Sequence, residues 1–128
     1  MRGTLAAVVL AGVVAAVALS APAIAREHSG GAGRTEITVA DLPQEARTTL
    51  RRIHDGGPFP YERDGITFGN RERHLPREPH GYYHEYTVKT PGVHNRGARR
   101  IICGGARSTP DSCYYTDDHY QTFRKIRE

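Results

Sequence analysis

Three kinds of side chain in the second half of the chain could together act on a phosphodiester: a carboxylate, a group of arginines and a histidine. The carboxylate is Glu85, which lies within residues 82–88, a run of strand-forming residues. Alternate side chains of a strand point to opposite faces, so Glu85 shares one face with Tyr83 and Thr87. The other face carries Tyr82, His84, Tyr86 and Val88. A carboxylate among strand-forming aromatic residues is unusual, which makes Glu85 the first candidate for chemistry.

The arginines and the histidine supply the other two groups. Residues 96–102 are rich in arginine, and guanidinium forks bind phosphate oxygens well. Within this run Arg100 and Ile102 share a strand face. His119 follows Asp117 and Asp118, and neighbouring carboxylates would favour its protonated form near neutral pH.

A base, an acid and paired guanidinium groups are the minimum for cleaving a phosphodiester through its own 2′-hydroxyl group. The base removes the hydroxyl proton, the cations stabilise the charge of the transition state, and the acid protonates the departing 5′-oxygen. This chemistry needs neither a metal nor a cofactor, and we predict none. Cys103 and Cys113 have no histidine around them at the spacing of a structural zinc site.

Each candidate also has a simpler interpretation. Glu85 could pair with a cross-strand arginine on the sheet surface, and Arg99 with Arg100 could form a solvated basic strand. His119 could be an ordinary surface histidine. The residue types alone therefore predict only an exported α+β domain.

The beginning of the chain predicts export. Residues 1–25 have a positive start, an apolar stretch and a small-residue cleavage pattern at Ala23-Ile24-Ala25, as a secretory signal peptide has. A membrane anchor is the alternative, but the stretch is short for a span. Residues 26–36 are glycine-rich and predict a flexible leader, and residues 37–128 form one domain. The net charge of +4 permits a polyanionic partner without establishing one.

The elements that must position the candidates are one helix followed by strands. Leu42, Ala46, Leu50 and Ile53 recur at helical spacing before Gly56-Gly57. Short β-favouring runs follow, separated by turn residues, at 65–68, 82–90, 99–104, 113–116 and 122–126. The pattern predicts an α+β fold, with one N-terminal helix packed on an antiparallel sheet of about five strands.

Several stretches, in order, resemble the guanyl-specific secreted ribonucleases of bacteria, the RNase Sa and barnase type of microbial ribonuclease. The resemblance extends over residues 37–128 and includes Asp41-Leu42-Pro43, Gly57-Pro58-Phe59-Pro60-Tyr61, Phe68-Gly69-Asn70-Arg71-Glu72, Gly81-Tyr82-Tyr83-His84-Glu85-Tyr86-Thr87-Val88, Thr90-Pro91-Gly92, Arg96-Gly97-Ala98-Arg99-Arg100-Ile101-Ile102-Cys103-Gly104, Tyr114-Tyr115-Thr116, and Asp118-His119-Tyr120 with Phe123.

The resemblance implies a role for individual residues. Glu85 matches the catalytic base and His119 the catalytic acid, while Arg96 and Arg100 match the phosphate-binding arginines. The implied guanine pocket uses the carboxylate of Glu72, which accepts from N1 and N2 of the base. It also uses the backbone of Phe68, Asn70 and Arg71, and the ring of Tyr120. Adenine has an acceptor at N1 and no N2 amine, so it would leave a buried carboxylate unpaired.

Three departures from the family pattern stand out. Gly69 replaces a frequent glutamine, which removes one side chain from the pocket wall. The terminal disulfide is missing, because Thr38 stands at its first cysteine and the chain stops at Glu128 before its second. About three extra residues precede Cys113, and Cys103 and Cys113 are expected either to bridge two neighbouring strands or to remain as two buried thiols.

The resemblance implies a secreted, extracellular, monomeric endoribonuclease. It would cleave single-stranded RNA after guanosine to a 2′,3′-cyclic phosphate and then hydrolyse this to a 3′-phosphate, because only an unstacked base enters such a pocket. A barstar-like protein inhibitor is implied as a partner. The alternatives are a catalytically weak module on the same scaffold that binds RNA or an inhibitor, and a toxin that acts inside rival cells, although the chain has no delivery domain.

Overall fold

The computed structural model describes residues 3, 9, 11–18 and 35–128. Most of the predicted signal peptide (1–25) and leader (26–36) lies outside these residues. In the described part of the chain, no helix is long and apolar enough to span a membrane. The first strand, β1, already begins at Glu36, next to the predicted start of the domain.

The predicted helix is α1, Gln44–Asp55. It begins directly after Pro43, whose fixed φ suits the position before a helix and whose missing N–H is not needed there. It ends where Gly56 adopts the left-handed conformation, with φ of 79°, and the Gly57 N–H donates to the Arg52 carbonyl at 2.9 Å. The stripe predicted from the sequence is the buried one: Leu42, Ala46, Leu50 and Ile53 are at most 4% exposed.

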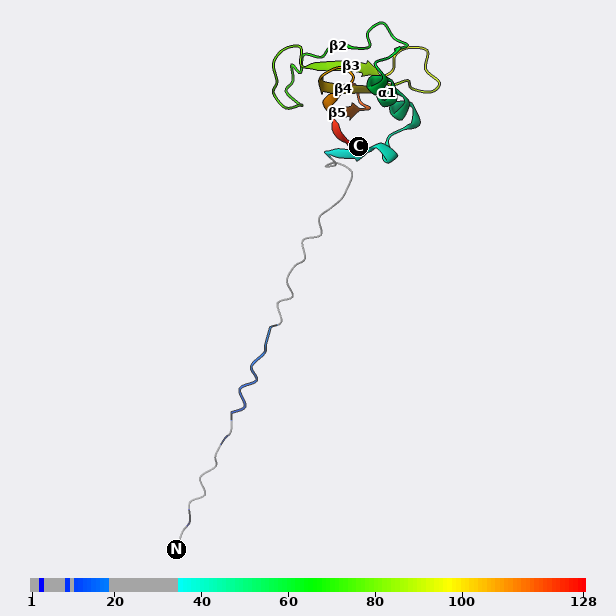
Figure 1. Ribbon diagram of the computed structural model, residues 1–128. Coiled ribbons are helices and arrows are strands. Elements are labelled where there is room, and N and C mark those ends of the chain that lie inside the picture. The colour runs from blue at the N-terminus through cyan, green and yellow to red at the C-terminus, as the bar shows by residue number, and fades with distance from the viewer. Residues whose placement is uncertain (1–2, 4–8, 10, 19–34) are drawn as a thin grey trace.

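Six strands form one sheet in the order β1-β6-β5-β4-β3-β2. Their bounds are β1 Glu36–Thr38, β2 Ile66–Thr67, β3 Tyr83–Thr87, β4 Arg100–Gly105, β5 Pro110–Thr116 and β6 Arg124–Arg127. A short 3-10 helix, η1, covers Val39–Asp41. All neighbours pair antiparallel except β1 and β6, which are parallel and lie side by side at the C-terminus (Figure 1). The predicted α+β architecture is confirmed, and the extra edge strand β1 makes the sheet mixed.

Strand boundaries differ from the prediction at three places. β3 stops at Thr87, because Pro91 and Gly92 already turn the chain. β5 begins at Pro110 rather than residue 113, because the β4–β5 pairing continues through a register shift at Gly104 and Gly105. β6 begins at Arg124 rather than residue 122, because hydrogen bonds to Asp118 hold Thr122 in the preceding turn.

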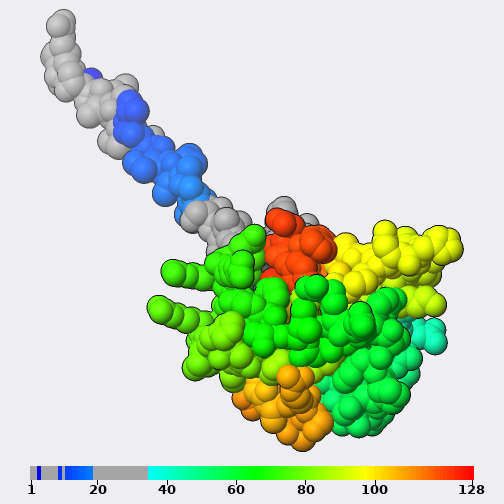
Figure 2. Space-filling view, turned by 90° about the horizontal axis from the view of Figure 1, so that it is seen from above, coloured from blue at the N-terminus to red at the C-terminus, as the bar shows by residue number. Residues whose placement is uncertain are grey.

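The two faces of the sheet carry different sets of side chains. One face carries Tyr86, Val88, Ile101 and Tyr115, which pack beneath α1 in the main core. The opposite face carries Glu85 and Thr87 together with a smaller apolar cluster around Leu75, Tyr83 and Ile102. The alternation predicted for residues 82–88 is confirmed for Tyr83, Glu85 and Thr87 on one face and for Tyr86 and Val88 on the other. It is wrong for Tyr82, which precedes β3 and packs against the cluster of Tyr83. Figure 2 shows three segments next to one another at the surface: the green segment after β2, the orange-red turn before β6 and the yellow loop before β4.

Cys103 and Cys113 face each other across β4 and β5 and form a disulfide, with an S–S distance of 2.06 Å. Both are at most 5% exposed and belong to the main core. The cross-link closes a loop with a sequence separation of 10.

Replacing both cysteines with alanine should lower the free energy of unfolding by about 2–3 kcal/mol, since the cross-link limits the unfolded chain. Urea unfolding of the oxidised protein and of the double variant measures this difference. Dithiothreitol should weaken the parent protein and leave the variant unaffected. Equal stability of the two oxidised proteins would contradict the prediction.

Candidate active site

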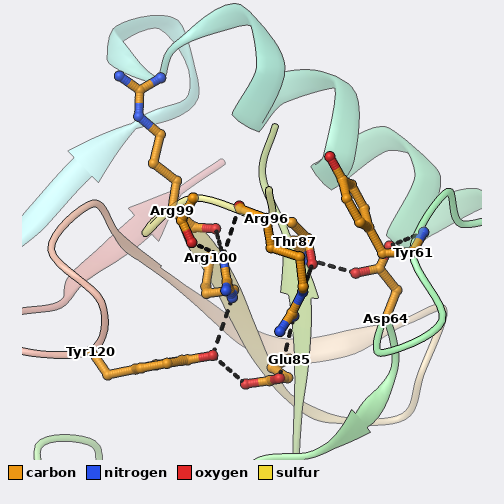
Figure 3. Close-up of polar contacts among 9 residues, drawn as sticks. Tyr61, Asp64, Glu85, Thr87, Arg96, Arg99, Arg100 and Tyr120 are labelled. Carbon is orange, nitrogen blue, oxygen red and sulfur yellow. Dashed lines mark hydrogen bonds and ion pairs between the residues drawn. The ribbon is translucent and has the colours of Figure 1, made fainter. Parts of the chain in front are cut away.

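Glu85, in the middle of β3, is the most deeply buried acid of the site, with only 5% of the residue exposed. Its Oε2 accepts a 2.6 Å hydrogen bond from the Tyr120 hydroxyl, and its Oε1 lies 3.5 Å from Nη2 of Arg96. Burial raises the pKa of Tyr120, and the hydrogen bond to Glu85 raises it further, so the phenol remains a donor. The carboxylate is thus held in one orientation, with a cation beside it (Figure 3).

The two predicted phosphate-binding arginines are held differently. Arg96 donates from Nε and Nη2 to the Thr87 hydroxyl at 3.1 and 2.9 Å, which holds its guanidinium beside Glu85. Arg100 is only 2% exposed: its Nη1 donates to the carbonyls of the loop that carries Arg96, and its Nε donates to the Tyr120 hydroxyl at 3.1 Å. Arg99, in contrast, points away from this cluster (Figure 3).

His119 comes from the turn between β5 and β6. His119 and Tyr120 have positive φ angles of 56° and 71°, a conformation that L-residues with side chains seldom adopt. The His119 N–H donates to the Ala98 carbonyl at 3.0 Å, which ties this turn to the loop of Arg96. The backbone is therefore bent at the point where the histidine and tyrosine side chains must face Glu85.

The two acids beside His119 have hydrogen-bond or ion-pair partners of their own. Asp118 accepts hydrogen bonds from the hydroxyls of Thr116 and Thr122, at 2.9 and 2.5 Å, and from the Thr122 N–H. Asp117 lies 3.5 Å from Arg124. Both carboxylates thus have partners other than the imidazole, and Asp118 braces the turn.

This bracing predicts a pH-dependent loss of stability in Asp118→Asn. Burial by itself raises the pKa of Asp118, but the hydrogen bonds from Thr122 and Thr116 outweigh it and the net pKa lies below its usual value. A lowered folded pKa stabilises the fold above the ordinary value of 3.8, and this stabilisation is lost as the pH falls through the lowered value. Asp118→Asn should therefore cost about 2 kcal/mol of unfolding free energy at pH 7.

Urea unfolding at a series of pH values measures the difference between the parent protein and Asp118→Asn. The gap should close below the ordinary carboxyl pKa. The exposed Glu62→Gln, which lies outside the turn, controls for loss of a negative charge. A gap that stays constant down to acid pH would contradict the assignment.

Residues 68–72 form the second wall of the site. The Phe68 ring stacks on Tyr120, with centroids 5.4 Å apart and planes at 20°. Asn70, with φ of 50°, clamps Leu75 from both sides: its Oδ1 accepts from the Leu75 N–H at 3.1 Å, and its Nδ2 donates to the Leu75 carbonyl at 2.9 Å. The Phe68 N–H donates to the Tyr83 carbonyl at 2.9 Å. This amide is therefore already hydrogen-bonded to β3 and is not free to bind a ligand.

A cavity of about 470 Å³ opens between these segments. Eight of the nine residues predicted for catalysis and guanine binding line it: Phe68, Asn70, Arg71, Glu72, Glu85, Arg96, His119 and Tyr120. The ninth, Arg100, lies behind Tyr120 and does not line the cavity. The lining also includes Gly69, which the sequence placed in the pocket wall, and five residues to which the sequence gave no role: Arg63, Ile66, Thr67, His74 and Phe123.

Gly69 leaves less of a gap than its missing side chain suggests. A Cβ at this position would lie 3.5 Å from Cγ and 3.7 Å from Nε of Arg71, which are ordinary contacts. The Arg71 side chain therefore already covers part of the wall that a longer residue would form. Gly69 has no positive φ, so its backbone would accept a side chain.

The assembled site can move protons and stabilise negative charge. It has a buried carboxylate, an imidazole and a guanidinium around one cavity, which are the groups that acid–base cleavage of a phosphodiester uses. A flat aromatic pair and an exposed carboxylate at the other end could hold a base that donates hydrogen bonds. Within the described residues, no group of three or more His, Cys, Asp or Glu side chains could hold a metal ion.

Comparison with known proteins places the chain. A family model described as ribonuclease matches residues 25–127. Guanyl-specific ribonuclease Sa of Kitasatospora aureofaciens is 53% identical over 90 residues, covering 70% of this chain and 91% of Sa. Guanyl-specific ribonuclease St of Saccharopolyspora erythraea is 50% identical over 92 residues, covering 72% and 87%.

Solved structures with a similar fold are also ribonucleases. Ribonuclease Sa2 in complexes with mononucleotides superposes with a TM-score of 0.69 at 43% identity, covering 75% of this chain and 96% of Sa2. Ribonuclease Sa2 with guanosine-2′-cyclophosphate gives a TM-score of 0.67 at 44% identity, covering 74% and 97%. The chain belongs to the ribonuclease family, among the guanyl-specific ribonucleases that include Sa and St.

Proposed function

We propose that this protein is a secreted endoribonuclease that cleaves single-stranded RNA on the 3′ side of guanosine. The observation that carries the proposal is one cavity lined both by Glu85, Arg96 and His119 and by residues 68–72. Catalytic and base-binding groups are thus side by side, as cleavage next to a selected base requires. The guanyl-specific relatives and the Sa2 complex with guanosine-2′-cyclophosphate support the same substrate.

In the first step, Glu85 accepts the proton of the ribose 2′-hydroxyl, and the 2′-oxygen attacks phosphorus. The bond from phosphorus to the 5′-oxygen breaks, and His119 donates its proton to that oxygen. Arg96, beside Glu85, stabilises the negative charge of the phosphoryl oxygens, while buried Arg100 holds the Arg96 loop and Tyr120 in place and adds positive charge behind them.

In the second step the roles of acid and base reverse. His119, now neutral, removes a proton from water, which attacks the cyclic phosphate, and Glu85 returns its proton to the 2′-oxygen. The product is a 3′-phosphate. DNA has no 2′-hydroxyl and is therefore not cleaved by this route.

Base selection is assigned to Glu72, Phe68 and Tyr120. The two aromatic rings offer a flat apolar surface for a purine, and the Glu72 carboxylate accepts hydrogen bonds from N1 and N2 of guanine. Adenine offers no donor at these positions. The side chain of Glu72 is 68% exposed before RNA binds, so the discrimination depends on the base covering it.

Cleavage of the dinucleotides GpC and ApC, with chromatography of the products over time, tests the function. GpC should give guanosine 2′,3′-cyclic phosphate first and guanosine 3′-phosphate later, at a rate that a chelator does not change. Equal rates on GpC and ApC would contradict the guanosine preference. Formation of 3′-phosphate without a cyclic intermediate would contradict the mechanism.

Secretion and protein partners extend the proposal. The apolar segment within residues 1–25 supports export by a signal peptide, and mass measurement of the protein in culture medium would locate the cleavage. We further propose that the mature protein is a monomer and that a barstar-like inhibitor of acidic surface would cover the site. Arg63, Arg71 and Arg96 around the cavity offer a cationic surface for it.

A further inference from the structure

His74 lies beside the carboxylate that we assign to guanine recognition. Its Nε2 is 2.9 Å from Oε2 of Glu72, and both residues line the cavity. This pair shares no hydrogen bond or ion pair with Glu85 or His119, and the proposed cleavage steps make no use of it. Because His74 contacts the Glu72 carboxylate, which we assign to guanine recognition, a role for His74 in base selection is indicated.

His74 is itself held in place. Its ring packs near Phe123, with centroids 6.3 Å apart, and it directly precedes Leu75, which is 4% exposed and clamped by Asn70. The His74 side chain is 43% exposed, and that of Glu72 is more exposed still, at 68%. A free glutamate at the surface samples many rotamers and must give up that freedom when a ligand fixes it. His74, with Phe123 beside its ring and buried Leu75 next in the chain, is therefore the better supported partner of the pair.

We propose that His74 is a positioning residue that orients Glu72 to accept both the N1 and N2 donors of guanine. The inference rests on the proposed function. A carboxylate has about four acceptor positions on its two oxygens, so a hydrogen bond from His74 to Oε2 leaves room for one donor on each oxygen. An Nε2–H donor is present in the imidazolium ion and in one neutral tautomer, and the orientation persists in both.

A substrate with inosine in place of guanosine tests whether the Glu72 carboxylate must be oriented or only present. Inosine keeps the N1 donor of guanosine and lacks the N2 amine. A carboxylate that is free to rotate can still accept one hydrogen bond, but it meets two donors together less often. Loss of His74 should therefore reduce kcat/KM for GpC by about fivefold, as expected when a mobile side chain must be ordered on binding. The value for IpC should change less than about twofold.

The experiment measures kcat and KM for GpC, IpC and ApC with the full protein and with His74→Leu, His74→Gln and His80→Gln. His74→Leu should raise KM for GpC, leave kcat unchanged and lower the ratio of GpC to IpC. His74→Gln keeps an amide donor near the Nε2 position and should restore most of that ratio. His80→Gln, exposed on the same loop and outside the cavity, is the matched control and should behave as the parent protein.

Thermal unfolding of each variant shows that it is folded before its kinetics are compared. An unchanged ratio of GpC to IpC in folded His74→Leu would overturn the inference. So would an equal loss on both substrates, which is the result of a general disturbance of the cavity. Glu72→Gln distinguishes failure of the proposed base selection from failure of the His74 inference. If Glu72→Gln keeps the preference for GpC over ApC, Glu72 does not select the base. If only the His74 variants behave as the parent protein, the positioning role of His74 is contradicted and base selection by Glu72 stands.

Discussion

Glu85→Gln should lower kcat/KM for GpC by about a thousandfold, and His119→Ala should lower it by a similar factor. General bases and acids each contribute about 10²–10⁴ in rate. Glutamine keeps the shape and the hydrogen bond from Tyr120 but cannot take the 2′-hydroxyl proton, so the loss should fall on kcat rather than on KM. Initial rates on GpC, together with calorimetric measurement of guanosine 3′-phosphate binding, distinguish an effect on kcat from an effect on KM.

Two exposed residues provide matched controls for these variants. Glu62→Gln removes a carboxylate near β2, and His80→Gln removes an imidazole from the loop before β3; neither lines the cavity. Both should cleave GpC at the parental rate. The double variant Glu85→Gln with His119→Ala should lose less than the product of the two single losses, since the groups act in one step. Near-parental activity in either single variant would contradict the proposed acid–base mechanism.

Glu72→Gln should lower kcat/KM for GpC by at least about a hundredfold while leaving ApC almost unchanged. Two hydrogen bonds to a charged acceptor are replaced by one acceptor and one amide that faces a donor. The ratio of GpC to ApC should therefore fall by the same factor. Because Glu72 is not among the groups proposed to act on the phosphate, the variant should still form the cyclic intermediate from GpC.

Glu78→Gln, an exposed acid on the same loop, controls for the change in charge near the cavity. It should keep the parental ratio of GpC to ApC. If Glu72→Gln slowed GpC and ApC by the same factor, Glu72 would stabilise the loop rather than select the base. That outcome would separate specificity from catalysis in this site and would leave the roles of Glu85 and His119 untouched.

Local patterns in the sequence predicted the elements that carry the site. The helical spacing of Leu42, Ala46, Leu50 and Ile53 located α1, because burial of one stripe is what stabilises a short helix. The alternation along residues 82–88 placed Glu85 on the face opposite Tyr86 because side chains in a strand have a period of two. Assigning roles to these residues needed the family resemblance, since each residue alone had a simpler explanation.

The missed features depend on contacts between distant segments. β1 has only three residues, too few for a periodic signal, and it exists because β6 pairs with it. The partners of the acids beside His119 could not be predicted, because neighbours in sequence need not touch: Asp118 turns back to Thr116 and Thr122. His74 could have been noticed two positions after Glu72, but nothing in the sequence shows which side chains the loop brings together.

The parallel pairing of β1 with β6 joins the first strand of the sheet to the last. These two strands lie at one edge of the sheet, whereas β2, whose Ile66 and Thr67 line the cavity, forms the opposite edge. A peptide joined ahead of β1 or after β6 would therefore extend from the edge opposite β2, which makes either position suitable for attaching the protein to a solid support.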